Sequence, residues 1–83
     1  MADSNVYYEL IAHICDLTTR EDGWRKELNI VAWNGGKPSY DIREWSPAHS
    51  QMTRGVRLSD DEMGRLMKGM LDYYAERSSL NVK

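Results

Sequence analysis

Tryptophan and arginine are the residue types in this sequence whose placement best suits binding chemistry. The three tryptophans, Trp24, Trp33 and Trp45, all fall between residues 24 and 58. That segment has six cationic side chains and three acidic ones, whereas the whole chain of 83 residues has a net charge of −2. The six cations are Arg25, Lys26, Lys37, Arg43, Arg54 and Arg57. Because indoles stack on unpaired bases and cations contact phosphates, the segment indicates a nucleic-acid-binding surface. Composition alone is equally compatible with tryptophans that fill a core.

Residue combinations typical of catalysis or of a bound metal are absent from the sequence. His13 and His49 lie far apart, and the Gly35-Gly36 pair lacks the further glycines of a phosphate-binding loop. Cys15 has no Cys or His partner at zinc-ligand spacing. We therefore predict a non-enzymatic protein without cofactor or metal, in which His13 lies on a strand face and His49 in a solvated loop.

Length and hydropathy limit the architecture to one small domain, residues 1–83. A domain of this size leaves much of its surface exposed, which favours self-association. No apolar run approaches the roughly 20 residues that cross a bilayer, and residues 1–5 lack the pattern of a signal peptide. We expect a cytoplasmic, nucleoid-associated protein.

Four strands are predicted before a single helix. Residues 6–17 favour a strand, with a helix as the alternative, and residues 24–33, 40–45 and 55–58 favour strands. Asn34-Gly35-Gly36 supplies residues that tolerate positive φ in a hairpin turn. The fold class is therefore α+β, a twisted antiparallel four-stranded sheet followed by a C-terminal helix.

Strand alternation separates two faces of this sheet. Leu28, Ile30 and Ile42 share one face, which we expect to meet the helix. The opposite face consists of polar, charged and aromatic side chains and is expected to be exposed to solvent. It contains Arg25, Asn29, Trp33, Asp41, Arg43 and Trp45.

The helix is expected to begin after Ser59, because Ser59 and Glu62 form a capping box. Its apolar stripe is about 160° wide, broader than one sheet requires. We therefore predict a homodimer joined partly through Leu66, Met70, Tyr73 and Tyr74. The methionines are also compatible with a peptide-binding groove. Residues 78–83 are expected to fray.

Several blocks together resemble the transcriptional positive cofactor 4 family, and its bacterial branch in particular. They are residues 23–29 (GWRKELN), 33–37 (WNGGK), 40–47 (YDIREWSP) and 54–59 (RGVRLS), followed by an amphipathic helix. The resemblance covers about residues 24–71. It implies a β-β-β-β-α chain, a homodimer, and sheet-lined channels that bind single strands or melted duplex.

The resemblance also implies roles for individual residues. Trp33 and Trp45 match the family's aromatic positions, and Lys37, Arg43 and Arg54 match its cationic ones. The Ser- and Lys-rich tail of eukaryotic members is absent, and the spacing after Glu44 is one residue shorter than in those members.

The sequence therefore predicts single-stranded DNA binding with little sequence preference, in transcription, replication or repair. The predicted contacts are Arg25, Trp33, Lys37, Arg43, Trp45 and Arg54. The alternatives are single-stranded RNA binding, or a protein-interaction module that recruits a transcription partner through the Met-rich helix.

Overall fold

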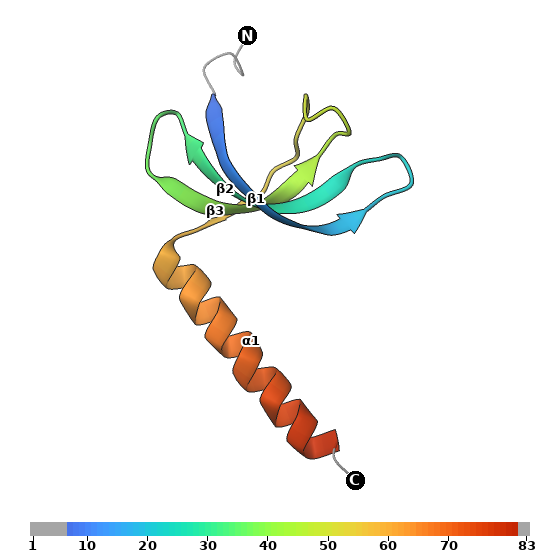
Figure 1. The fold of residues 1–83 in the computed structure, drawn as a ribbon, viewed down its shortest axis with the longest axis vertical. Helices are drawn as coiled ribbons and strands as arrows, with labels where there is room; N and C mark the ends of the chain where they lie inside the picture. The colour runs from blue at the N-terminus through green and yellow to red at the C-terminus, as the bar shows by residue number, and fades with distance from the viewer. Residues whose placement is uncertain (1–6, 82–83) are drawn as a thin grey trace.

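The computed structural model describes the backbone of residues 7–81 and the side chains of residues 7–77. Its elements are the strands β1 (Tyr8–Thr19), β2 (Arg25–Trp33), β3 (Pro38–Trp45) and β4 (Val56–Leu58), followed by the helix α1 (Asp60–Asn81). The strands form one antiparallel sheet in the order β1-β2-β3-β4 (Figure 1). The predicted α+β class and element order are confirmed, and the segment with the helix alternative forms a strand. The predicted fraying of residues 78–83 stays a prediction for Val82 and Lys83, which lie outside the described residues, while the backbone of α1 is helical to Asn81.

The β2–β3 connection, residues 34–37, contains a turn whose two central residues have the expected positive φ angles. Asn34 and Gly35 have φ values of 50° and 75°. The amide of Gly36 donates to the carbonyl of Trp33 at 2.8 Å. Positive φ at both central residues matches the right-handed twist of the flanking strands. The strands on either side of this connection pair in the register that places Leu28 opposite Ile42 and Ala32 opposite Pro38.

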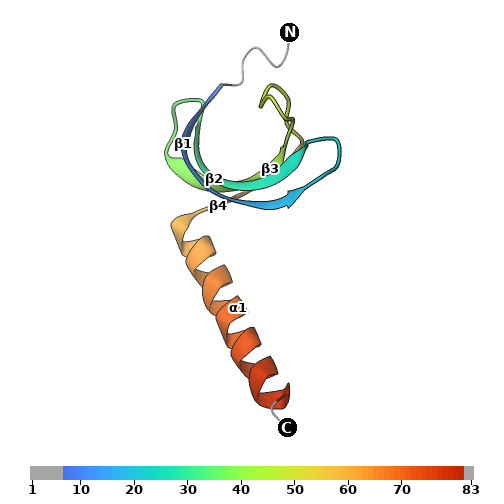
Figure 2. The ribbon, with the colours of Figure 1, turned by 45° about the vertical axis from the view of Figure 1, so that its right-hand side comes forward.

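The sheet is strongly curved, so that it resembles a trough in Figure 2. The pairing of β1 with β2 is interrupted by three register shifts, which fall between Leu10 and Ala12, His13 and Cys15, and Asp16 and Thr18. Each bulge bends the strand and increases its local twist. Repeated bulges therefore account for the way β1 wraps around β2.

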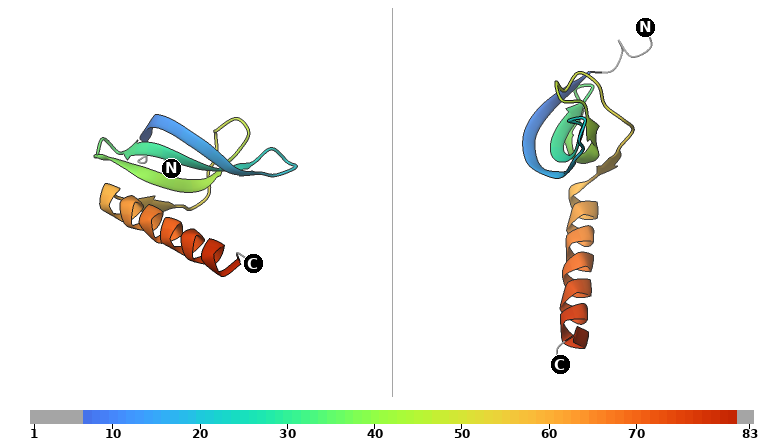
Figure 3. Two further views of the ribbon diagram at one scale, coloured as in Figure 1. Left: turned by 60° about the horizontal axis from the view of Figure 1, so that its bottom comes forward. Right: turned by 90° about the vertical axis from the view of Figure 1, so that its right-hand side faces the viewer.

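The helix begins as predicted but does not cover the sheet. The Ser59 hydroxyl accepts from the Glu62 amide at 3.2 Å, and the Glu62 carboxylate accepts from the Ser59 amide at 2.9 Å. After Met63, which is buried, α1 projects away from the convex side of the sheet (Figure 3). The expectation that Leu28, Ile30 and Ile42 meet the helix is wrong, because α1 leaves the sheet after its first turn and these three side chains stay half-buried.

Gly55 lies where the chain approaches β3 too closely for any side chain. A Cβ at this position would stand 2.5 Å from the Ile42 carbonyl oxygen and 2.6 Å from the Arg43 Cβ. We expect Gly55→Ala to lower the free energy of unfolding by about 1–3 kcal/mol, as overpacking does. Gly64→Ala is the matched control, because a Cβ there meets nothing within 4 Å and alanine favours a helix. Urea unfolding checks both, and a Gly55→Ala protein as stable as wild type would contradict the packing described here.

Candidate nucleic-acid interface

The concave face of the sheet gathers charged and aromatic side chains in rows that cross the strands. Arg25 on β2 stands opposite Trp45 on β3, and Glu27 stands opposite Arg43. A longer row crosses all four strands. It runs from His13 through Asn29 and Asp41 to Arg57. The predicted separation of faces by strand alternation is therefore correct, although the charged face is concave and also contains Glu27.

Two arginines contact the indole of Trp33. The guanidinium carbons of Arg43 and Arg57 each lie 4.5 Å from its ring centroid. Tyr8 stands between the two tryptophans, with ring centroids 5.6 Å from Trp33 and 5.3 Å from Trp45. The concave face thus combines stacking rings and cations within one cluster.

The prediction that Trp33 and Trp45 are exposed on the solvent side of the sheet is wrong. Their exposed fractions are 8% and 1%. Neither indole lies beneath the helix, since Met67 and Met70 are exposed. The curvature of the sheet covers the indoles instead, because it brings Tyr8 and the loop after β3 over the concave face. Both indole Nε1–H groups are buried without a hydrogen-bond partner among the described residues, which is rare for buried donors.

Arg43 is held by the buried carboxylate of Asp41. Arg43 Nε and Nη2 donate to the two oxygens of Asp41, both at 2.7 Å. Arg43 Nη1 also donates to the Thr53 carbonyl at 3.1 Å. This paired geometry fixes the guanidinium over Trp33 and offsets much of its charge.

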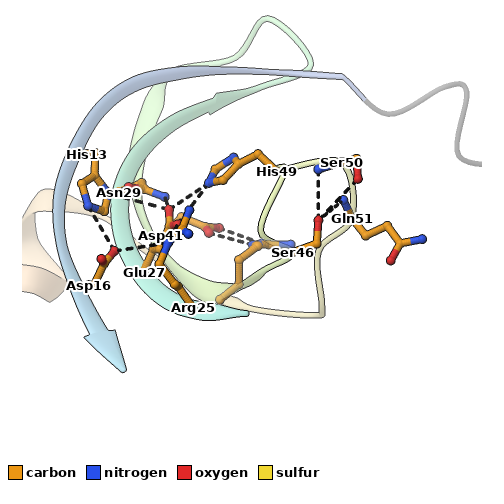
Figure 4. Close-up of polar contacts among 11 residues, drawn as sticks. His13, Asp16, Arg25, Glu27, Asn29, Asp41, Ser46, His49, Ser50 and Gln51 are labelled. Carbon is orange, nitrogen blue, oxygen red and sulfur yellow. Dashed lines mark hydrogen bonds and ion pairs between the residues drawn. The ribbon is translucent and has the colours of Figure 1, made fainter. Parts of the chain in front are cut away.

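Glu27 is the centre of a second polar cluster on the concave face (Figure 4). Asn29 donates to Glu27 Oε1 at 2.9 Å, and Arg25 Nε donates to Oε2 at 3.1 Å. His49 Nε2 lies 3.0 Å and 3.1 Å from the two oxygens. Burial raises the pKa of Glu27, but the hydrogen bonds from Asn29 and His49, the charge of His49 and the hydrogen bond from Arg25 together hold this pKa below its usual value.

His49 is not the solvated loop residue that the sequence predicts. Its ring stacks on Trp45 with a centroid distance of 4.1 Å and an interplanar angle of 4°. The Ser46 hydroxyl accepts from the amides of Ser50 and Gln51 at 3.1 Å and 2.9 Å, which folds the loop back over β3. The sequence gives no local signal for this contact, because it depends on the curvature that brings the loop to Glu27.

The comparisons with known proteins fit this arrangement of residues. A family model described as Transcriptional Coactivator p15 (PC4) matches residues 20–69, more than half of the chain. The chain belongs to this family. The chain is also 38% identical over 63 residues to an uncharacterized protein of Treponema pallidum (strain Nichols), an alignment that spans 76% of this chain and 74% of that protein.

Membership of the p15 (PC4) family gives the chain a nucleic-acid-binding, coactivator-like role, and the family is a non-enzymatic DNA-binding one. The predicted resemblance to this family is confirmed. Within residues 7–81, no helix is long and apolar enough to cross a membrane.

Two of the predicted contacts of this p15 (PC4) family member lie away from the tryptophan cluster. Lys37 follows the β2–β3 turn and lines a hollow with Asp60 and Asp61 at the start of α1. Arg54 precedes β4 and lines a groove of about 360 Å³ with Lys26 and Arg43. The structure thus brings Arg25, Trp33, Arg43 and Trp45 to one face and leaves Lys37 and Arg54 at its margins.

His13, Asp16 and Glu27 form the one group of possible metal ligands found among the described residues, with ligand atoms within 4.8 Å of one another. His13 Nδ1 lies 2.6 Å from Asn29 Oδ1, and His13 Nε2 lies 3.2 Å from Asp16. The guanidinium of Arg25 lies 3.1 Å from Glu27 and 3.9 Å from Asp16, and it already compensates both carboxylates. A divalent cation would have to compete with this arginine.

Sequence reasoning missed three residues of this family member's concave face. Arg57 contacts Trp33, Glu27 gathers the polar cluster, and His49 covers Trp45. Strand alternation could have placed Glu27 with Arg25, since both occupy odd positions of β2. The role of Arg57 follows from its register opposite Asp41, which the short β4 does not reveal by pattern.

Proposed function

We propose that the protein is a homodimer that binds single-stranded DNA on the concave faces of its sheets, with little overall sequence preference, in transcription, replication or repair. Arg25, Trp33, Arg43 and Trp45 form the centre of the binding surface, and Lys37 and Arg54 contact phosphates at its margins. Arg57, which lies exposed beside Trp33, joins the predicted contacts.

One observation supports this proposal most directly. The guanidinium groups of Arg43 and Arg57 each lie 4.5 Å from the ring of Trp33, and Trp45 lies in the same aromatic cluster through Tyr8. Both indoles are buried, so a strand must first displace the side chains that cover them. Stacking on the ring then contributes about 1–3 kcal/mol per base, which compensates for a small positive charge. Duplex DNA gains less from such a surface, because its bases are already stacked on one another.

The exposed face of α1 supports the homodimer. Its apolar side chains remain in contact with solvent over most of the helix. The exposed set is Leu66, Met67, Met70, Leu71, Tyr73 and Tyr74. An isolated helix is marginal in water, so a helix that leaves its own sheet needs another surface to cover it. A second copy provides an identical apolar face by twofold symmetry.

Titration with oligothymidylate tests the binding function. We expect wild-type indole fluorescence to change on binding, and affinity to fall as salt rises. Arg57→Ala should weaken binding and reduce the salt slope by about one, the change expected for loss of one phosphate contact. Lys68→Ala is the matched control, because it removes one positive charge from the helix surface, where Lys68 pairs with Asp72 at 2.8 Å.

The outcomes separate the proposal from its alternatives. Tighter binding of a matched oligoribonucleotide would make the protein a single-stranded RNA binder instead. Loss of affinity equal in Arg57→Ala and Lys68→Ala would place the strand elsewhere. An unchanged fluorescence with both nucleic acids would favour a protein-interaction module built on the Met-rich helix.

A further inference from the structure

The imidazole of His49 occupies a position on Trp45 that has the geometry of a stacked base. The two rings are nearly parallel, at 4°, with a centroid distance of 4.1 Å. The edge of the same imidazole points at Glu27, whose carboxylate lies at hydrogen-bond distance from Nε2. A planar ring stacked on an aromatic side chain and bonded along its edge is how proteins hold unpaired bases.

The carboxylate of Glu27 has a defined set of acceptor positions at this place. Oε1 already accepts from Asn29 and Oε2 from Arg25. Each carboxylate oxygen has two lone-pair positions. When His49 leaves, one position therefore becomes free on each oxygen, and the two free positions lie side by side. Asn29 and Arg25 still donate to the carboxylate when His49 leaves, and these bonds favour its ionised form, which is an acceptor only.

We propose that this position is a guanine subsite, in which a guanine base replaces the His49 ring on Trp45 and donates its N1–H and N2–H groups to the two oxygens of Glu27. The inference rests on the proposed single-strand binding and adds a base preference at one position of the strand.

The donor pattern of the bases makes guanine the matching ligand. Its Watson–Crick edge carries two adjacent N–H donors, which a carboxylate accepts in parallel. Cytosine and adenine present one exocyclic amine, and thymine presents a single N–H between two carbonyl oxygens that repel Glu27. Guanine alone therefore fills both acceptor positions.

His49 is placed so that it can leave. Its side chain is 28% exposed, which gives the ring a route to solvent. Its backbone has a φ of 63°, a conformation that costs free energy in a residue other than glycine. The contacts of its ring with Trp45 and Glu27 are both replaced by equivalent contacts when guanine binds.

Three otherwise identical oligothymidylate probes test the wild-type protein without any substitution. One contains a single central guanine, one a single inosine, and one only thymine. A bidentate pair discriminates by about fivefold to a hundredfold, so we expect the guanine probe to bind about tenfold more tightly than the thymine probe. Inosine lacks the N2 amine and should fall between them. Equal affinities for the guanine and inosine probes would overturn the subsite.

Two variants then connect the preference to the named residues. Glu27→Gln should abolish the preference for guanine, whereas His49→Ala should raise affinity for the guanine probe more than for the thymine probe. Ser50→Ala is the control within the same loop, because its hydroxyl lies only near that of Ser46, at 3.4 Å. A guanine preference that persists in Glu27→Gln, or an affinity that His49→Ala leaves unchanged, would overturn the inference while the proposed function stands.

Two further outcomes are informative. If none of the probes binds, both the subsite and the proposed function fail. If guanosine monophosphate alone binds as tightly as the guanine probe, the position is a site for a free nucleotide and not for a base within a strand.

Discussion

Met70→Asp is expected to convert a dimer into a monomer whose helix is largely unfolded. The wild-type chain of 9.6 kDa should sediment at twice this mass at micromolar concentration. In the variant, each copy would place a carboxylate in the apolar interface. An uncompensated buried charge costs about 3–5 kcal/mol. Since the twofold axis places this charge in both copies, the dissociation constant of the dimer should rise by at least about a hundredfold.

The helix is the element that depends most on this interface. Met70 is 41% exposed in the single chain, and its neighbours Leu66 and Tyr74 are 46% and 54% exposed. Because α1 receives little support from its own sheet, loss of the partner removes most of the packing that stabilises the helix. Circular dichroism should therefore lose helical signal in Met70→Asp, while the strand signal persists.

Gly69→Asp is the matched control for this prediction. It adds the same negative charge to α1 at a position away from the centre of the apolar stripe, where a side chain meets no atom within 4 Å. We expect it to remain dimeric. Sedimentation of the wild-type chain as a monomer at micromolar concentration, or equal effects of the two variants, would contradict helix pairing.

The sequence predicted those features that follow from local rules. The alternation of Leu28 and Ile30 with Arg25 and Asn29 identified the two faces of β2. The turn at Asn34 and the capping box at Ser59 followed from backbone preferences that act within four residues. These features depend on neighbours along the chain, so a single sequence contains the information needed to place them.

The curvature of the sheet could not be predicted in this way, and it determines most of the candidate site. The three bulges of β1 arise from its pairing with β2, and no residue pattern within β1 predicts them. Curvature then buries Trp33 and Trp45 and brings His49 to Glu27. The face was predicted correctly, whereas its exposure was not, because exposure depends on contacts between segments far apart in the sequence.

The direction of the helix has a related explanation. A wide apolar stripe predicts that the helix is covered but does not specify by which surface. The helix makes its main sheet contacts with β3 and β4 and then projects away from the convex side, so Leu28 and Ile42 on that side stay half-buried. The pairing of copies is a property of two chains, and for this reason the dimer remains a proposal that Met70→Asp tests.

Asp41→Ala is expected to destabilise the fold strongly. Asp41 is fully buried, and the Arg43 side chain is 9% exposed. Removal of the carboxylate leaves the guanidinium buried without its partner, which typically costs about 3–5 kcal/mol. Urea unfolding at one fixed protein concentration measures this loss, because the stability of a dimer depends on concentration.

A double variant distinguishes the cost of an unpaired charge from the net contribution of the ion pair. Asp41→Leu combined with Arg43→Met replaces both groups by apolar side chains, so no charge remains to be compensated. We expect this protein to be more stable than Asp41→Ala, since well-packed apolar residues often replace a buried ion pair at little cost.

Asp72→Ala is the control, because it breaks the exposed pair with Lys68, and exposed pairs contribute only about 0–1 kcal/mol. If Asp41→Ala and Asp72→Ala were equally stable, the bidentate pair would not be the interaction that fixes Arg43 over Trp33. If the double variant kept its stability but lost affinity for oligothymidylate, the pair would serve binding and contribute little to folding.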